Sequence, residues 1–125
     1  MDYVRDNFDN DFAVPREELL RTKNGAGTTV RITPDNLLMN IVSYIGKKLS
    51  IVGCVNMEFI LNEGHYYLID INPRFSAGVA FSNFIGYNMV TSHLNAFIGG
   101  CISSPIEIKE QIICKRYKEE LLWMK

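Results

Sequence analysis

The chain has 125 residues, of which 47% are hydrophobic and 22% are charged, and this profile is typical of one globular domain rather than a disordered segment. Its net charge of −1 and its lack of a basic run argue against a nucleic-acid partner held by phosphate neutralisation. No apolar stretch reaches the length of a membrane span, and the acidic, polar N-terminal sequence is not that of a signal peptide.

The cysteine content points to a reducing environment. The three cysteines, Cys54, Cys101 and Cys114, are odd in number and widely spaced, which argues against a disulfide framework and against a zinc site. We therefore expect each to be a small buried apolar residue, and we expect the protein to be cytoplasmic.

The chain is predicted to begin with a hairpin. Residues 3–16 contain two apolar runs separated by the turn-rich cluster 9–11. The assignment of residues 15–22 stays open. Residues 23–27 form a glycine-bearing loop, and residues 28–32 alternate as a short strand does.

Residues 33–50 contain the strongest helix signal in the chain. Thr33 is a candidate N-cap, and Pro34 suits the first helical position. We expect the apolar stripe of this helix to face the core, with a partner surface as the alternative. The stripe consists of Leu37, Leu38, Ile41, Val42, Ile45 and Leu49.

The second half of the chain is predicted to contain a hairpin followed by two helices. Residues 51–61 and 66–72 are β-rich, and the polar segment 62–65 between them indicates an antiparallel turn. Residues 79–85 and 89–98 are helical stretches, and each is followed by glycine.

The remaining signals concern the second of these helices and the C-terminal region. Asn88 is a candidate N-cap. Residues 105–111 suggest a short helix, and residues 112–123 begin with β-rich character that could close a sheet edge. No linker divides the chain, so we expect a single domain over residues 1–125. The predicted fold class is α+β, with an antiparallel β-sheet and helices packed on one face.

The end of the second predicted strand carries the most distinctive polar pattern. Alternation places Tyr66, Leu68, Asp70 and Asn72 on one face. An odd number of loop residues at 62–65 would add Glu58 to that face. A two-residue turn would place Glu58 on the opposite face, unless a bulge restored the phase.

If Glu58 shares the face of Asp70 and Asn72, three hard oxygen ligands converge as a magnesium site requires. Arg74 follows at once and could bind a phosphate or carboxylate through two hydrogen bonds. The alternative is that Asp70 and Asn72 satisfy backbone groups at a strand end and that Glu58 is solvated.

The segment MEFILNEGHYYLIDINPRFSAG, which begins at Met57, resembles the late hairpin of ATP-grasp enzymes, especially their carbamoyl-phosphate-synthetase-like branch. In that family an acid is followed twelve positions later by the pattern acid-x-Asn-Pro-Arg. Here Glu58 occupies the first position, and Asp70, Asn72, Pro73 and Arg74 complete the pattern. The family more often has Glu where this chain has Asp70, which shortens that ligand by one methylene.

The resemblance implies a nucleotide-dependent ligase. Glu58, Asp70 and Asn72 would bind Mg²⁺, with Mn²⁺ as the alternative, bridging the triphosphate of ATP. Arg74 would steady the transferred phosphoryl group or acyl-phosphate, and Lys23 in the glycine-bearing loop could face the phosphates, although a solvated loop is the alternative. Such enzymes phosphorylate a small-molecule carboxylate and let an amine displace the phosphate.

The resemblance covers only the C-terminal part of an ATP-grasp unit. It implies that the N-terminal nucleotide-gripping half is absent, so we expect a fragment or split subunit that needs that half or a companion subunit and turns over nothing alone. Exposed apolar surface on such a piece could make it a homodimer. The rival hypotheses are a non-catalytic interaction domain that keeps the fold and an unrelated α+β domain with a chance motif.

Overall fold

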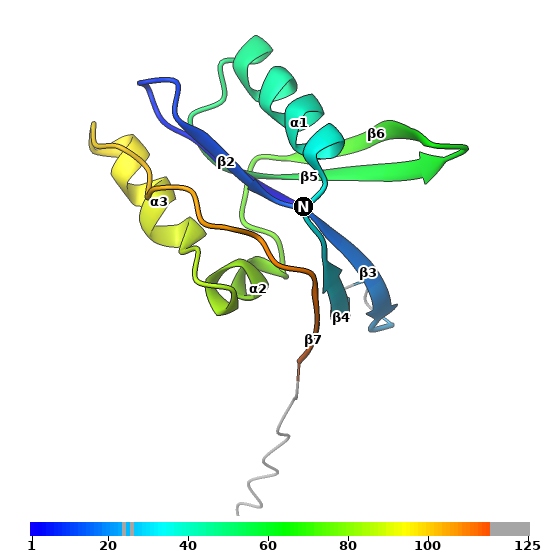
Figure 1. Cartoon of the computed structure of the whole chain (residues 1–125). Coiled ribbons are helices and arrows are strands. Elements are labelled where there is room, and N and C mark those ends of the chain that lie inside the picture. Colours follow the sequence, from blue (N-terminus) through cyan, green and yellow to red (C-terminus); the bar gives the residue numbers. More distant parts are fainter. Residues whose placement is uncertain (24, 26, 116–125) are drawn as a thin grey trace, which may run out of the picture.

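The computed structural model describes residues 1–23, 25 and 27–115 (Figure 1). It contains three helices and seven strands in these residues, and it confirms the α+β class. The helices are α1 (Asn36–Lys48), α2 (Val79–Phe84) and α3 (Met89–Phe97). The strands are β1 (Asp2–Arg5), β2 (Asp11–Val14), β3 (Arg16–Arg21), β4 (Gly27–Ile32), β5 (Gly53–Asn62), β6 (His65–Asn72) and β7 (Gln111–Cys114).

The strands form two antiparallel sheets. The four-stranded sheet has the order β2-β1-β5-β6, and the three-stranded sheet has the order β3-β4-β7. The predicted hairpins and the strand at residues 28–32 are confirmed, and the open segment 15–22 contains β3. β7 pairs with β4 at an edge, as the β-rich start of residues 112–123 suggests. Residues 116–123 of that segment, and two positions of the loop 23–27, lie outside the described residues.

The helices cover both faces of the four-stranded sheet (Figure 1). The expectation that they pack on one face holds only for α2 and α3, because α1 covers the opposite face. Neighbouring residues of β1 show the division. Tyr3 points toward Gly46 of α1, whereas Asp2 accepts a hydrogen bond of 3.1 Å from Ser82 of α2. Both faces of this sheet are buried, since successive side chains of a strand point to opposite sides.

Each face has its own apolar core. The core beneath α1 contains Met1, Tyr3, Ala13, Leu38, Val42, Val55 and Met57. The core beneath α2 and α3 also includes residues from the three-stranded sheet. Its buried members are Val4, Phe12, Val14, Val30, Ile32, Cys54, Phe81, Tyr87, Met89, Ala96, Ile102 and Ile113.

The N-cap of α1 is Asp35 rather than Thr33. The Asp35 carboxylate accepts a hydrogen bond of 2.8 Å from the amide of Leu38, so the helix begins two residues later than Pro34 suggests. The capping bond explains the difference, because an Asp side chain three residues before a free helical amide satisfies it directly. The predicted N-cap of α3, Asn88, is confirmed by its 3.0 Å bond from the amide of Thr91.

The apolar stripe of α1 is only partly buried. Leu38 and Val42 are buried, but Leu37 and Leu49 are each 58% exposed. The helix rests on the narrow sheet along one line, so the residues at its flanks and end remain accessible. None of the helices that the structure describes is long and apolar enough to cross a membrane.

Two further expectations are wrong. Residues 105–110 form no helix, and Ile106 and Ile108 instead pack against the core with the two-residue spacing of an extended segment. Cys101 and Cys114 are exposed, and only Cys54 is buried, where burial raises the pKa of its thiol to about 12.

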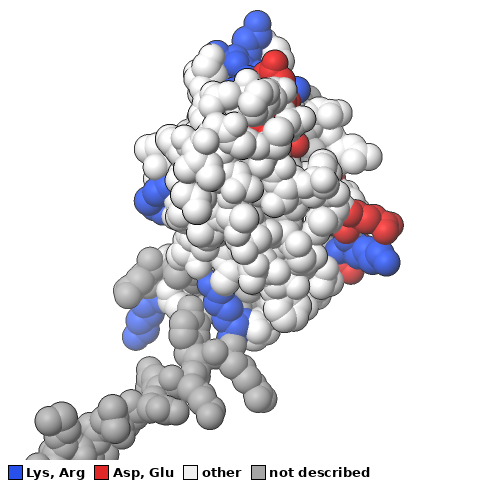
Figure 2. All heavy atoms as spheres, turned by 90° about the vertical axis from the view of Figure 1, so that its left-hand side faces the viewer, with Lys and Arg blue, Asp and Glu red and all other residues white. Residues whose placement is uncertain are grey.

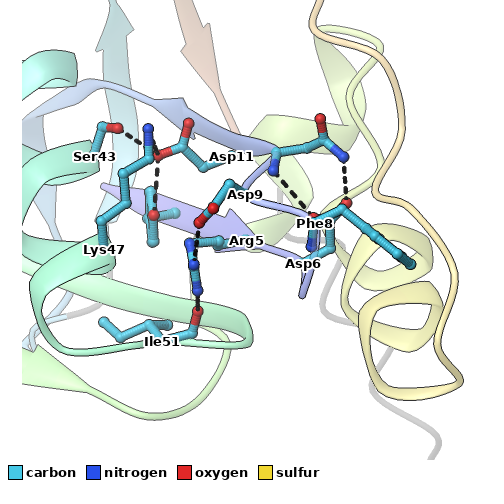
Figure 3. A network of polar contacts seen from close by, with 10 residues as sticks. Arg5, Asp6, Phe8, Asp9, Asp11, Ser43, Lys47 and Ile51 are labelled. Carbon is cyan, nitrogen blue, oxygen red and sulfur yellow. Dashed lines mark hydrogen bonds and ion pairs between the residues drawn. The ribbon is translucent and has the colours of Figure 1, made fainter.

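Polar contacts hold the β1–β2 hairpin to its surroundings (Figure 3). The buried carboxylate of Asp6 accepts hydrogen bonds from the amides of Phe8 and Ile102 at 2.8 and 3.0 Å, and from the amide and side chain of Asn10 at 3.1 and 2.9 Å. Burial by itself would raise the pKa of Asp6, but these hydrogen bonds outweigh it and lower the pKa below its usual value. The carboxylate therefore stabilises the fold in its charged form.

A second carboxylate ties the same hairpin to α1 (Figure 3). Asp11 accepts hydrogen bonds from the Tyr3 hydroxyl, at 3.1 Å, and from Ser43, and its distance to the Lys47 ammonium is 4.0 Å. Burial and the Asp11 carboxylate raise the pKa of the Tyr3 hydroxyl, which stays protonated as the donor.

We expect Gly46→Ala to destabilise the fold. Gly to Ala in a helix normally stabilises by about 1 kcal/mol, but a Cβ at Gly46 would lie 2.1 Å from the Tyr3 hydroxyl, which is fully buried. Overpacking of this kind costs about 1–3 kcal/mol. Urea unfolding measures the change, with Asn40→Ala at an exposed position of α1 as the matched control, expected to stabilise slightly. A Gly46→Ala chain as stable as the control would contradict the close packing.

We expect Asp6→Asn to destabilise the chain by about 2 kcal/mol at pH 7, because an amide nitrogen cannot accept the bonds that the charged carboxylate accepts. The pKa of Asp6 is lower in the folded chain than its usual value of 3.8. The charged carboxylate therefore adds to the free energy of unfolding above pH 3.8, and this addition is lost as the pH falls below 3.8. The difference between Asp6→Asn and the unaltered chain should therefore shrink in urea unfolding at pH 3. Asp9→Asn, at a side chain that is 75% exposed, should show little of this dependence.

Candidate functional site

The β5–β6 hairpin that carries the predicted site has a tight turn. Glu63 and Gly64 form a two-residue connection, with Asn62 opposite His65. Their φ angles of 50° and 79° are both in the left-handed region, as a type I′ turn requires. In a regular hairpin, a two-residue turn would put Glu58 and Asp70 on opposite faces.

A bulge in β6 restores the phase. Phe59 lies opposite Leu68, but Glu58 lies opposite Asp70, so Ile69 is an extra residue on β6. Directly opposed residues of an antiparallel pair project to the same side. Glu58 and Asp70 therefore share a face, as the magnesium hypothesis requires.

Because of this bulge, the prediction that Tyr66 and Leu68 share a face with Asp70 is wrong. Tyr66 and Leu68 do not share the face of Asp70, because they lie opposite Leu61 and Phe59. The Tyr66 ring packs edge-on against Phe59, 6.3 Å between centroids. Its hydroxyl donates to the Asp35 carboxylate, which raises the pKa of Tyr66 to about 12.

Asn72 connects the other two predicted residues. Its Nδ2 donates to the Asp70 carboxylate at 2.8 Å, and its Oδ1 accepts from Arg74 Nη2 at 3.4 Å. Arg74 Nη1 also donates to the carbonyl of Phe75 at 3.2 Å. Asp70 and Arg74 are exposed, and Glu58 and Asn72 are half-buried. Rotation of the Asn72 amide by a half-turn would present its oxygen, rather than its nitrogen, toward Asp70.

A groove with a volume of about 820 Å³ lies between the β5–β6 hairpin and the strands β3 and β4. Glu58 and Ile69 line it, whereas Asp70, Asn72 and Arg74 do not. Its walls combine apolar side chains with several charged ones. The charged residues that line it are Arg16, Glu17, Glu18, Arg21, Arg31, Asp35, Glu58 and Glu110.

Most of the groove's arginines are already paired. Arg21 Nε lies 2.5 Å from Glu18, and Arg31 Nη1 lies 2.8 Å from Glu17. Glu58 has no ion pair of this kind within the described residues. A groove with neutralised arginines and an unpaired Glu58 favours a cation at that end.

A buried ion pair lies next to this groove. Arg16 Nη1 is 2.6 Å from Asp2, and their side chains are only 3% and 0% exposed. The Arg16 guanidinium also packs beneath Gly78, where a Cβ would lie 3.0 Å from Cζ. Sequence reasoning missed Asp2, since only the pairing of β1 with its neighbours shows that it is buried beside Arg16.

Lys23 is exposed at the turn between β3 and β4, and it does not line the groove. Its role toward phosphates stays a prediction. His93 is a structural residue, because it accepts a 2.9 Å hydrogen bond from the Cys54 amide and packs between the rings of Phe75 and Phe97. His65 is exposed at the hairpin turn.

The donor set fits a hard cation. Within the residues that the structure describes, no three His, Cys, Asp or Glu side chains form a metal cluster, which is unlike a zinc site. Glu58, Asp70 and Asn72 instead offer two carboxylates and one amide. Mg²⁺ is commonly bound by one or two carboxylates, with waters and substrate phosphates as its other ligands.

Comparison with known proteins identifies related sequences. Residues 1–120 match the family described as ATP-grasp in the biosynthetic pathway with Ter operon. The chain is also similar to the carbamoyl phosphate synthase large chain of Thermoplasma acidophilum, with 33% identity over 89 residues. That match covers 64% of this chain but only 8% of the relative, so the chain spans a small part of the relative's length.

We expect the register of the hairpin to survive deletion of Ile69. The deletion removes the extra residue of the bulge and leaves Glu58 opposite Asp70 in a regular ladder. Cross-strand nuclear Overhauser contacts between these two residues should remain. Insertion of one glycine after Ile69 should instead disturb this pairing, and an insertion that left it unchanged would contradict the register described above.

Proposed function

Since the chain belongs to the ATP-grasp family, we propose that Glu58, Asp70 and Asn72 bind magnesium ions that hold the triphosphate of ATP. The observation that carries the proposal is the bulge at Ile69, which puts Glu58 opposite Asp70. Asn72 is hydrogen-bonded to Asp70 at 2.8 Å. The three potential ligands thus lie on one side of the hairpin.

Arg74 is the proposed phosphoryl-binding residue. It is exposed, and within the described residues its guanidinium donates to the neutral oxygens of Asn72 and Phe75 and forms no ion pair. A guanidinium that is not paired to a carboxylate is free to bind a phosphate or acyl-phosphate. Its contact with Asn72 keeps it next to the metal ligands.

The reaction we propose is ATP-dependent ligation. A small-molecule carboxylate takes the terminal phosphoryl group of ATP, and an amine then displaces phosphate from the resulting acyl-phosphate. Magnesium, when bound, neutralises charge on the triphosphate. The contribution of Glu58, Asp70, Asn72 and Arg74 is to position the phosphates and to balance their charge.

The groove supports this assignment. It is large enough for a small molecule, and Glu58 lies in its wall, so a substrate in the groove would lie beside one of the three proposed metal ligands. We therefore place the carboxylate or amine substrate there. Adenine contacts have no counterpart in the described residues that we can assign, and we propose that another segment or a companion subunit supplies them.

The metal ligands can be tested with Mn²⁺ as a paramagnetic probe of the chain. We expect Mn²⁺ with ATP to broaden the amide resonances of Glu58, Asp70 and Asn72 first. Glu58→Gln or Asp70→Asn should weaken Mn²⁺ binding by at least about tenfold, equivalent to about 1.4 kcal/mol. Asp70→Glu should retain binding, because it keeps the carboxylate.

The matched control is Glu63→Gln, which removes an exposed acid from the turn of the same hairpin and should leave Mn²⁺ binding unchanged. Broadening centred on Glu63, or binding that is indifferent to both Glu58→Gln and Asp70→Asn, would contradict the proposed site. In that case the alternative of a non-catalytic interaction domain would be favoured.

A further inference from the structure

Helix α3 is apolar on two sides. Its inner side contributes Met89 and Ala96 to the core. On the outer side, Val90, Leu94 and Phe97 are 51%, 58% and 64% exposed, and their spacing places them on one side of the helix. Contiguous exposed apolar patches on a protein surface mark interaction sites, so the outer side of α3 has the character of a covered surface.

Neighbouring segments extend this apolar surface. Ile98 follows directly and is 71% exposed, as is Phe84 at the end of α2, which packs beside α3. The β1–β2 turn lies at the C-terminal end of α3, since Asn7 donates to the carbonyl of Ala96, and Phe8 in that turn is 60% exposed. We call this surface the α3 face: Phe8, Phe84, Val90, Leu94, Phe97 and Ile98.

The α3 face carries no charge. No Asp, Glu, Lys or Arg occurs between Arg74 and Glu107, a stretch that includes all of α2 and α3. Figure 2 views the side of the molecule on which these helices lie, and its charged side chains are confined to the margins of a broad uncharged area. Charged residues are depleted at the centres of protein interfaces in the same way.

We propose that the α3 face binds the same face of a second copy of this chain. In a two-fold symmetric interface each patch meets itself, so a charged patch would repel its own copy. The α3 face avoids this, because it has no charged residue. Two copies of this face can therefore meet without repulsion between like charges.

The size of the face agrees with such a dimer. Its six side chains expose on the order of 600 Å² of apolar surface, if a full aromatic side chain contributes about 200 Å². The largest apolar patch on an ordinary monomer has an area of about 300–600 Å², so the α3 face is at the upper end of that range. Each partner contributes roughly 800 Å² to a standard interface, so the face would supply most of that area.

Sedimentation velocity of the full chain, from about 5 to 200 μM, tests the proposal. We expect a monomer–dimer equilibrium that Leu94→Glu weakens by at least about tenfold, because the new carboxylates would be desolvated near each other. The matched control is Leu61→Glu on the β5–β6 hairpin, since Leu61 is 59% exposed and Leu94 is 58% exposed. The control should leave the dimer intact.

Circular dichroism establishes that both variants are folded. As a measurement without any substitution, amide hydrogen exchange in residues 89–98 of the unaltered chain should slow as its concentration rises. A chain that stays monomeric at 200 μM, or a dimer that Leu61→Glu disrupts and Leu94→Glu does not, would overturn the proposal. So would a monomer that uses the α3 face to bind a different protein.

Discussion

Tyr66 and Ile71 of β6 both pack toward the core beneath α1. In a regular strand these two side chains would point to opposite faces, because successive side chains alternate and the two residues are an odd number of positions apart. The extra residue Ile69 resolves this conflict, and the candidate site depends on the result. Without the bulge, Asp70 would lie opposite Met57, on the apolar side, and would be a buried unpaired carboxylate. With the bulge, Asp70 reaches the polar side opposite Glu58. The need to bury one set of side chains thus determines which side of the hairpin Asp70 occupies.

The buried pair of Asp2 and Arg16 constrains a different part of the molecule. It joins the first residues of β1 and β3, and Ser82 of α2 donates to the same carboxylate oxygen. Burial of two charges is costly unless they are closely paired, so the 2.6 Å contact specifies how β3 meets the four-stranded sheet. That junction also forms one wall of the groove beside Glu58. An ion pair outside the hairpin therefore shapes the space next to Glu58.

The proposed catalytic and interaction surfaces involve different physical properties. The hairpin combines carboxylates, an amide and an arginine that are accessible to water, which suits charged phosphates. The α3 face is apolar and uncharged, which suits a protein surface. Because the two surfaces belong to different elements, substitutions can separate them. A dimer through α3 would leave Glu58 and Asp70 to act with whichever segment binds the nucleotide.

Local patterns in the sequence predicted the strands other than β3, the main helix, the Asn88 cap and the spacing of Asp70, Asn72 and Arg74 at a strand end, because these depend on neighbours within a few residues. The resemblance to ATP-grasp enzymes, through the twelve-residue spacing from Asp70, also predicted a role for Glu58. Only the tertiary structure decided whether these two residues share a face, since a bulge depends on which side chains the core requires. The cap at Asp35, the burial of Asp2 with Arg16 and the placement of α1 opposite α2 and α3 were decided in the same way. Each results from packing between different segments of the chain, and the local periodicity of the sequence does not indicate such contacts.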